Sequence, residues 1–140
     1  MVEWNLGTRI LKLGKRTFIM GVLNVTPDSF SDGGMHFDRD RAVEHALQML
    51  GDGADIIDVG GESTRPGTNI EESLVSEKEE LDRVIPVIKA LKQRRADAVI
   101  SVDTYKSSVA RAAVEAGAEI VNDVSGFLWD RLMVKTLAAL

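Results

Sequence analysis

The sequence predicts an α/β fold that is the N-terminal half of a (β/α)8, or TIM, barrel preceded by a short β-hairpin. Apolar, strand-like runs alternate with helical patterns, as in parallel sheets built from βα units. Each run finishes on an amide or a carboxylate, and the runs lie at residues 18–24, 54–62, 98–103 and 118–123. The length of 140 residues suits half of a barrel that usually needs about 250 residues. A four-stranded open sheet is the alternative, but no polar edge strand that would finish it is evident.

We expect residues 1–140 to form one partial barrel domain, with a hairpin over residues 1–16 and βα units 1–4 over residues 17–140. The hairpin is predicted because its apolar residues lie among Gly7 and Gly14, which are turn signals.

The first unit is predicted as a strand at residues 18–23, a polar loop to residue 37 and a helix that Asp38 caps. The second has a strand at residues 54–59 and a long loop to residue 75. Ser76 and Glu79 then form a capping box for a helix, and Pro86 is expected to kink that helix without ending it.

The last two units are predicted as strands at residues 98–102 and 118–121, with Gly117 closing the helix between them and a final helix at residues 130–140.

The chain contains an internal echo, because residues 53–58 match residues 117–122 position for position. The echo places Asp58 and Asn122 at equivalent strand positions. Because side chains alternate along a strand, Asp123 is expected to point away from the face that Asn122 occupies.

Composition excludes several classes of protein. The absence of cysteine excludes disulfides, thiolate zinc sites and cysteine nucleophiles, and is consistent with a cytoplasmic protein. A net charge of −5 without a basic block argues against nucleic acid and against anionic membranes as partners. The two histidines show no metal-ligand spacing, and no phosphate-binding glycine loop of the Walker type is present.

The polar loop at residues 24–34 is too long for a simple connector. Asn24 can offer a carbonyl oxygen to a hard cation such as Mg²⁺. Asp32 can hydrogen-bond a substrate or orient a cation, and Phe30 can cover a planar ligand. The alternative for the other polar residues of this loop is that they only satisfy turn backbone groups.

The loop at residues 60–67 is rich in glycine, which allows a ligand to approach the backbone closely. Arg65 carries the fork that suits a carboxylate or phosphate, although a surface arginine in a turn is the alternative. Glu62 either takes part in the site or only supports the loop.

Asp103 and Asn122 end the third and fourth strands. A carboxylate at position 103 can accept hydrogen bonds from a ring or stabilise a cation, or it can instead cap the helix that begins near Tyr105. The Asn122 amide carries both a donor and an acceptor, so it can bind the edge of a heterocycle.

Four motifs together resemble dihydropteroate synthase. Residues 23–34 read LNVTPDSFSDGG and residues 58–67 read DVGGESTRPG, which look like the first and second signatures of that family. Residues 101–104 and 120–126 look like its third and fourth strand ends.

The resemblance implies a TIM barrel in which p-aminobenzoate displaces diphosphate from 6-hydroxymethyl-7,8-dihydropterin diphosphate to give 7,8-dihydropteroate, a step of folate biosynthesis. It implies that Asp103 and Asn122 hold the pterin, that Asp103 stabilises a pterin cation, and that Asn24 meets Mg²⁺ and the diphosphate. By the same resemblance, catalysis involves Asp103, Asp32 and Arg65. The loops that cover the site and shape the p-aminobenzoate pocket, which sulfonamides occupy, then contribute Phe30, Asp32, Thr64, Arg65 and Pro66.

The chain carries four βα units where the family has eight, so a second pterin-binding aspartate, a lysine and late basic residues of the family lack counterparts here. We therefore expect the 140-residue chain alone to have negligible synthase activity and to associate, as a homodimer. The alternatives are a non-catalytic pterin-binding module, a truncated fragment, or a barrel like the methyltetrahydrofolate-binding proteins of corrinoid methyltransferases. The last would not need the loops after the first two strands in this form.

Overall fold

The computed structural model describes residues 1–25, 35–62 and 75–140. Its strands are β1 (Val2–Asn5), β2 (Ile10–Leu13), β3 (Met20–Asn24), β4 (Ile56–Gly60), β5 (Val99–Asp103) and β6 (Ile120–Asn122). Its helices are α1 (Met35–Gly51), α3 (Glu77–Arg94), α4 (Ser107–Ala116) and α5 (Met133–Ala139).

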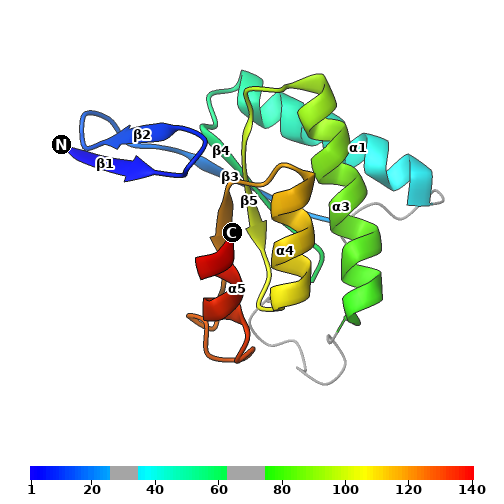
Figure 1. The fold of residues 1–140 in the computed structure, drawn as a ribbon. Helices are drawn as coiled ribbons and strands as arrows, with labels where there is room; N and C mark the ends of the chain where they lie inside the picture. Colours follow the sequence, from blue (N-terminus) through cyan, green and yellow to red (C-terminus); the bar gives the residue numbers. More distant parts are fainter. Residues whose placement is uncertain (26–34, 63–74) are drawn as a thin grey trace, which may run out of the picture.

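The strands form two sheets. β1 and β2 pair as an antiparallel hairpin, and β3 to β6 form a parallel sheet in the order of the sequence. Helices α1, α3 and α4 cover one face of the parallel sheet (Figure 1). The predicted hairpin and the succession of parallel βα units are confirmed.

The main core lies between that face and the helices. Leu23, Val59 and Val102 are cross-strand partners and are almost fully buried. They belong to one apolar cluster with Val84 and Leu91 of α3. Burial of apolar side chains on both layers holds the sheet and the helices together.

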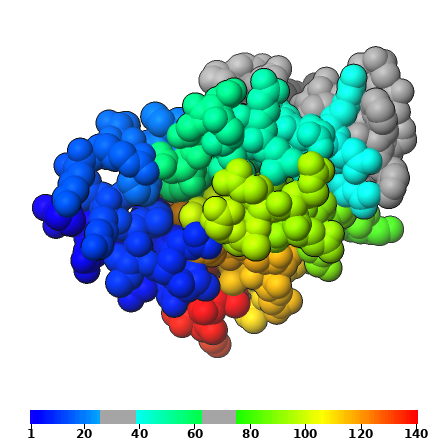
Figure 2. Space-filling view, turned by 90° about the horizontal axis from the view of Figure 1, so that it is seen from above, coloured from blue at the N-terminus to red at the C-terminus, as the bar shows by residue number. Residues whose placement is uncertain are grey.

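The hairpin covers the other face at the N-terminal ends of the strands. Ile56, Val99 and Ile120 form a second apolar cluster there, against which hairpin-side residues Leu6, Leu11 and Phe18 pack. Figure 2 shows the hairpin at one end of the molecule, close to the last residues of the chain, and both segments line one surface groove. The opposite, C-terminal end of that face stays uncovered by the hairpin.

Ion pairs and hydrogen bonds also hold the hairpin against the N-terminal end of the parallel sheet. Glu119, whose side chain is 5% exposed, accepts hydrogen bonds from Arg9 Nε at 2.8 Å and from Lys92 Nζ at 3.2 Å. The Thr8 hydroxyl also donates to Glu119. The contact between Arg9 and Glu119 joins two residues that are 110 positions apart in the sequence.

Two helix starts differ from the prediction. Helix α1 begins at Met35, so Asp38 lies inside the helix and is not its N-cap. Helix α5 begins at Met133 and not near residue 130. Asp130 precedes it in a turn, where its carboxylate accepts hydrogen bonds from the backbone N–H groups of Ser107 and Leu132.

The predicted Ser76 cap of α3 and the glycine at the end of α4 are confirmed. The Ser76 hydroxyl accepts from Glu79 N–H at 3.2 Å and caps α3, which continues through Pro86. Gly117 ends α4 with a φ of 125°, a conformation that favours glycine. No helix within the described ranges has both the length and the apolar character needed to cross a membrane.

Candidate active site

Four residues form a row across the C-terminal edge of the parallel sheet. Asn24 is the cross-strand partner of Gly60, Gly60 of Asp103, and Asp103 of Asn122. Partners in adjacent parallel strands point to the same face. Asn24, Asp103 and Asn122, which were predicted as site residues from their strand-end positions, therefore gather at one edge of one face.

A second polar row lies one residue pair deeper on the same face. Asp58 of β4 is the partner of Ser101 of β5, and both are buried. The Asn122 Nδ2 group donates a hydrogen bond to Asp58 Oδ2 at 3.2 Å. The internal echo placed Asp58 and Asn122 at equivalent strand positions but did not predict this contact, since β4 and β6 are not neighbours in the sheet.

The environment of Asp103 disfavours its charged form. Burial raises the pKa of Asp103 to about 6, and the negative charges of Asp58, Glu80, Asp123 and Glu62 add to the effect. Neither the Asp103 carboxylate nor the Asn24 amide makes a hydrogen bond to another residue of the described ranges. Among the described residues, no group competes with a ligand for these two side chains.

The alternative role of Asp103 as a helix cap is excluded. The N-cap residue of α4 is Lys106, whose backbone N–H donates to Thr104 Oγ1 at 3.1 Å. The next backbone N–H, that of Ser107, donates to Asp130 Oδ2 at 2.7 Å. The start of α4 is thus satisfied by Thr104 and Asp130 and leaves Asp103 free of that task.

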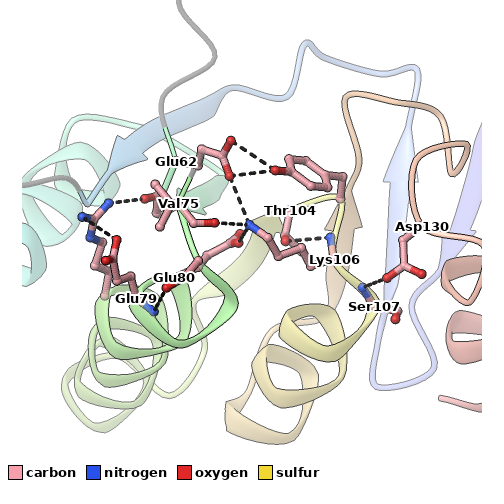
Figure 3. Close-up of polar contacts among 12 residues, drawn as sticks. Glu62, Val75, Glu79, Glu80, Thr104, Lys106, Ser107 and Asp130 are labelled. Carbon is pink, nitrogen blue, oxygen red and sulfur yellow. Dashed lines mark hydrogen bonds and ion pairs between the residues drawn. The ribbon is translucent and has the colours of Figure 1, made fainter. Parts of the chain in front are cut away.

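Beside this edge, Lys106 is the centre of a polar network (Figure 3). Its Nζ group donates to Glu80 Oε2 at 2.6 Å, to Glu62 Oε2 at 3.1 Å and to the carbonyl of Val75 at 2.9 Å. The Glu80 side chain is only 2% exposed. Burial alone would lower the pKa of Lys106, but Glu80 and Glu62 raise it above its usual value, so the ammonium group stays charged.

Tyr105 completes the network on the side of Glu62. Its hydroxyl lies 3.1 and 3.2 Å from the two carboxylate oxygens of Glu62, and its ring meets Trp129 edge-on at a centroid distance of 5.0 Å. Burial raises the pKa of Tyr105, so its hydroxyl remains a donor. The sequence left two roles open for Glu62, a part in the site or support of the loop after β4. These contacts favour support of the loop.

Asp123 also has a supporting role. Its Oδ1 accepts hydrogen bonds from the backbone N–H and the hydroxyl of Ser125, and its Oδ2 accepts from Phe127 N–H at 3.2 Å. The carboxylate thereby closes the turn after β6. Asn122 and Asp123 have separate sets of partners, as the alternation of side chains along a strand predicted.

Five predicted site residues lie outside the described residues, and their roles stay predictions: Phe30, Asp32, Thr64, Arg65 and Pro66. Within the described ranges, no group of three or more His, Cys, Asp or Glu side chains is arranged to hold a metal ion. The single candidate ligand from the sequence, Asn24, is partly buried at the end of β3.

Sequence reasoning missed Lys106, Glu80 and Asp58 as parts of the site's surroundings. Glu80 gave a usable signal, because it occupies a position in the apolar stripe of α3 where a charge needs a partner. Asp58 gave a second signal, because the internal echo placed it at the strand position equivalent to that of Asn122. Lys106 gave none, since its partners come from segments 26 and 44 residues away.

Comparisons with known proteins place the chain in one family. The family described as "Pterin binding enzyme" matches residues 20–140. The dihydropteroate synthase of Clostridium beijerinckii is 55% identical over 133 residues, which cover 95% of this chain and 48% of the relative. The chain thus spans about half the length of the curated relatives it matches.

Solved structures of the same family match this chain over about half of their own length as well. A dihydropteroate synthase from Clostridium difficile, solved in the presence of pteroic acid, matches with a TM-score of 0.85 and 54% identity over 92% of this chain and 47% of that one. A dihydropteroate synthase from Xanthomonas albilineans, solved with 4-aminobenzoic acid, matches with a TM-score of 0.85 and 47% identity over 98% of this chain and 48% of that one.

Proposed function

The chain belongs to the pterin-binding enzyme family, and from this membership we propose that it forms part of a dihydropteroate synthase. The reaction joins p-aminobenzoate to 6-hydroxymethyl-7,8-dihydropterin diphosphate and releases diphosphate. The observation that carries the proposal is the row of Asn24, Asp103 and Asn122 at one edge of the sheet. In (β/α)8 barrels that edge is where catalysis takes place.

In this proposal Asp103 and Asn122 bind the pterin ring. The bond between the pterin methylene carbon and the diphosphate oxygen breaks first, and its electron pair leaves with the diphosphate. The pterin then carries a positive charge, which an ionised Asp103 stabilises. With a pKa of about 6, Asp103 is mostly ionised at pH 7, and its partial burial strengthens its electrostatic effect.

The second half of the reaction forms the product bond. The amine nitrogen of p-aminobenzoate attacks the methylene carbon and then loses a proton. We propose that Phe30, Thr64 and Pro66 shape the pocket of this substrate, the pocket that sulfonamides occupy, and that Asp32 and Arg65 take part in catalysis.

We propose that a magnesium ion, held mainly by the substrate itself, takes part in the reaction. Mg²⁺ is commonly bound by one or two protein oxygens together with substrate phosphates, and the Asn24 amide has no other partner among the described residues. Asn24 would supply the protein oxygen. When bound, the ion would neutralise charge on the leaving diphosphate.

We further propose that the protein acts in the cytoplasm and as a homodimer. The absence of cysteine supports the first proposal. Exposed apolar residues after β6, among them Leu128 at 80% and Trp129 at 61%, support association through that surface.

Calorimetric titration of the chain with 6-hydroxymethylpterin diphosphate, with and without Mg²⁺, tests the ligand class. Binding by the unaltered chain, weakened at least about tenfold in Asn122→Ala, would support the proposal. Equal binding by the Asn122→Ala variant, or binding of p-aminobenzoate alone, would contradict it. Glu115→Gln on the exposed side of α4 is the matched control and should bind like the unaltered chain.

A further inference from the structure

We propose that Asp58 is a positioning residue that fixes the orientation of the Asn122 amide, and so decides which groups of Asn122 meet the ligand. The inference rests on the proposed function, since it concerns the same pterin site. It begins with the hydrogen bond of 3.2 Å from Asn122 Nδ2 to Asp58 Oδ2.

The two residues come from strands that are not neighbours. Asn122 on β6 lies opposite Asp103 on β5, and Asp58 on β4 lies opposite Ser101 on β5. The hydrogen bond therefore passes over β5 on the face that carries the site. The hydrogen bond lies beside Asp103. A ligand that contacts both Asp103 and Asn122 would therefore bind differently if the Asn122 amide changed its orientation.

The chemistry of the pair allows one amide orientation. A carboxylate only accepts hydrogen bonds, whereas an amide has a donating NH₂ group and an accepting oxygen. Rotating the Asn122 amide by half a turn would place its oxygen against the Asp58 oxygen, and the two would repel. With Nδ2 held by Asp58, Oδ1 of Asn122 points away from Asp58 as an acceptor. We infer that the ligand presents an N–H group to it.

A purely structural role explains Asp58 poorly. The residue is 3% exposed, and its Oδ1 is buried without a hydrogen-bond partner among the described residues. Ser101 Oγ, on its cross-strand partner, is in the same state. An unpartnered buried oxygen costs free energy, so an apolar residue at position 58 would suit stability better. The free energy lost at Asp58 is consistent with a part in ligand binding.

Three variants of the chain separate the roles. Asp58→Leu removes both oxygens, Asp58→Asn keeps one acceptor for Asn122, and Ser101→Ala alters the neighbouring buried oxygen without touching the hydrogen bond. Side-chain NH₂ resonances of Asn122, identified by their loss in Asn122→Ala, report the orientation in ¹⁵N–¹H NMR spectra without any ligand.

We expect one Asn122 side-chain proton to be shifted downfield in the unaltered chain, in Asp58→Asn and in Ser101→Ala. In Asp58→Leu that shift should disappear while the melting temperature stays equal or rises. Unchanged Asn122 resonances in Asp58→Leu would overturn the proposal. So would a fall in melting temperature with the Asn122 resonances intact, which is the signature of a structural role alone.

Titration with 6-hydroxymethylpterin then links orientation to binding. The affinity should fall about tenfold in Asp58→Leu and stay within about twofold in Ser101→Ala. Equal affinity of Asp58→Leu and the unaltered chain would overturn the inference. Failure of the unaltered chain to bind would count against the proposed function, and the spectra without ligand would still decide whether Asp58 orients Asn122.

Discussion

Asp103 occupies the space beside Gly60, its partner on the neighbouring strand. A Cβ atom at position 60 would lie 3.3 Å from Asp103 Cβ and 3.4 Å from Asp103 Oδ2. The missing side chain of Gly60 therefore lets the Asp103 carboxyl group lie over β4 at the edge where the site is built. The requirement for glycine here is one of space, since Gly60 is not among the glycines with positive φ.

Gly60→Ala should move Asp103 by a few tenths of an ångström. We expect the variant to fold, because the contact can be relieved by the side chain of Asp103, and to bind 6-hydroxymethylpterin several-fold more weakly. Gly51→Ala at the end of α1 is the control, since a Cβ there meets nothing within 4 Å. Titration of both variants with 6-hydroxymethylpterin measures the effect. Equal affinities of Gly60→Ala and Gly51→Ala would show that a Cβ atom at position 60 does not disturb Asp103.

Asp103 should make the chain less stable as the pH rises from about 4 to about 6. Its pKa in the folded chain is about 6, above its ordinary value of 3.8, so the folded state binds more protons in that interval. The penalty is absent below the ordinary value and fully present above 6. Because the group is partly exposed, Asp103→Asn should gain only about 1 kcal/mol in free energy of unfolding at pH 7.

Urea denaturation of the unaltered chain and Asp103→Asn at pH 4 and pH 7 measures this difference. A gain at pH 7 that vanishes at pH 4 is expected. A constant difference at both values would mean that the charge of Asp103 is not the cause.

Lys106→Met should destabilise the chain, because it leaves the buried Glu80 carboxylate and the partly buried Glu62 carboxylate without their cation. Loss of one partner of a buried ion pair costs about 3 kcal/mol. The matched control is Arg94→Met, whose exposed pair with Glu44 contributes about 0.5 kcal/mol or less. Thermal unfolding of both variants compares the costs, and similar losses would mean that solvent screens Lys106 as well.

Glu119→Gln should weaken the junction between the hairpin and the sheet. Burial alone would raise the pKa of Glu119, but hydrogen bonds from Thr8, Arg9 and Lys92 bring it below the usual value. A lowered pKa stabilises the fold above the pKa of the unfolded chain, and that contribution is lost as the pH falls through the folded pKa. We expect Glu119→Gln to cost about 3 kcal/mol at pH 7.

The cost of Glu119→Gln should shrink at pH 3, where the unaltered glutamate is protonated too. Denaturant midpoints at the two pH values provide the measurement, with Glu115→Gln on α4 as the exposed control. If Glu119→Gln lowers the free energy of unfolding equally at both pH values, the loss is caused by changed packing and not by the lost charge.

The residues of the candidate edge could be predicted because they follow from local pattern. Apolar runs fix the strands, parallel strands bring their carboxyl ends together, and Asn24, Asp103 and Asn122 stand at those ends. The echo of residues 53–58 in residues 117–122 placed Asp58 and Asn122 at equivalent strand positions, but it did not predict the hydrogen bond between them.

What the sequence could not supply depends on distant contacts. The backbone N–H of Ser107 at the start of α4 donates to Asp130, which lies 23 residues further along the chain, so the local pattern could not decide whether Asp103 caps this helix. Lys106 gains its role only when α3, α4 and the residues before them meet in space.

We propose above all that this chain carries part of the pterin site of a dihydropteroate synthase. The most direct test joins it to the part of the Clostridium beijerinckii relative that the match leaves out, 48% of that relative being covered. Formation of dihydropteroate from the two substrates is then measured for the chimera, for its Asp103→Ala variant and for the 140-residue chain alone. We predict turnover by the chimera, a loss of about 100-fold or more in Asp103→Ala, and negligible turnover by the chain alone. A folded chimera without turnover, or an Asp103→Ala variant as active as its parent, would contradict the account.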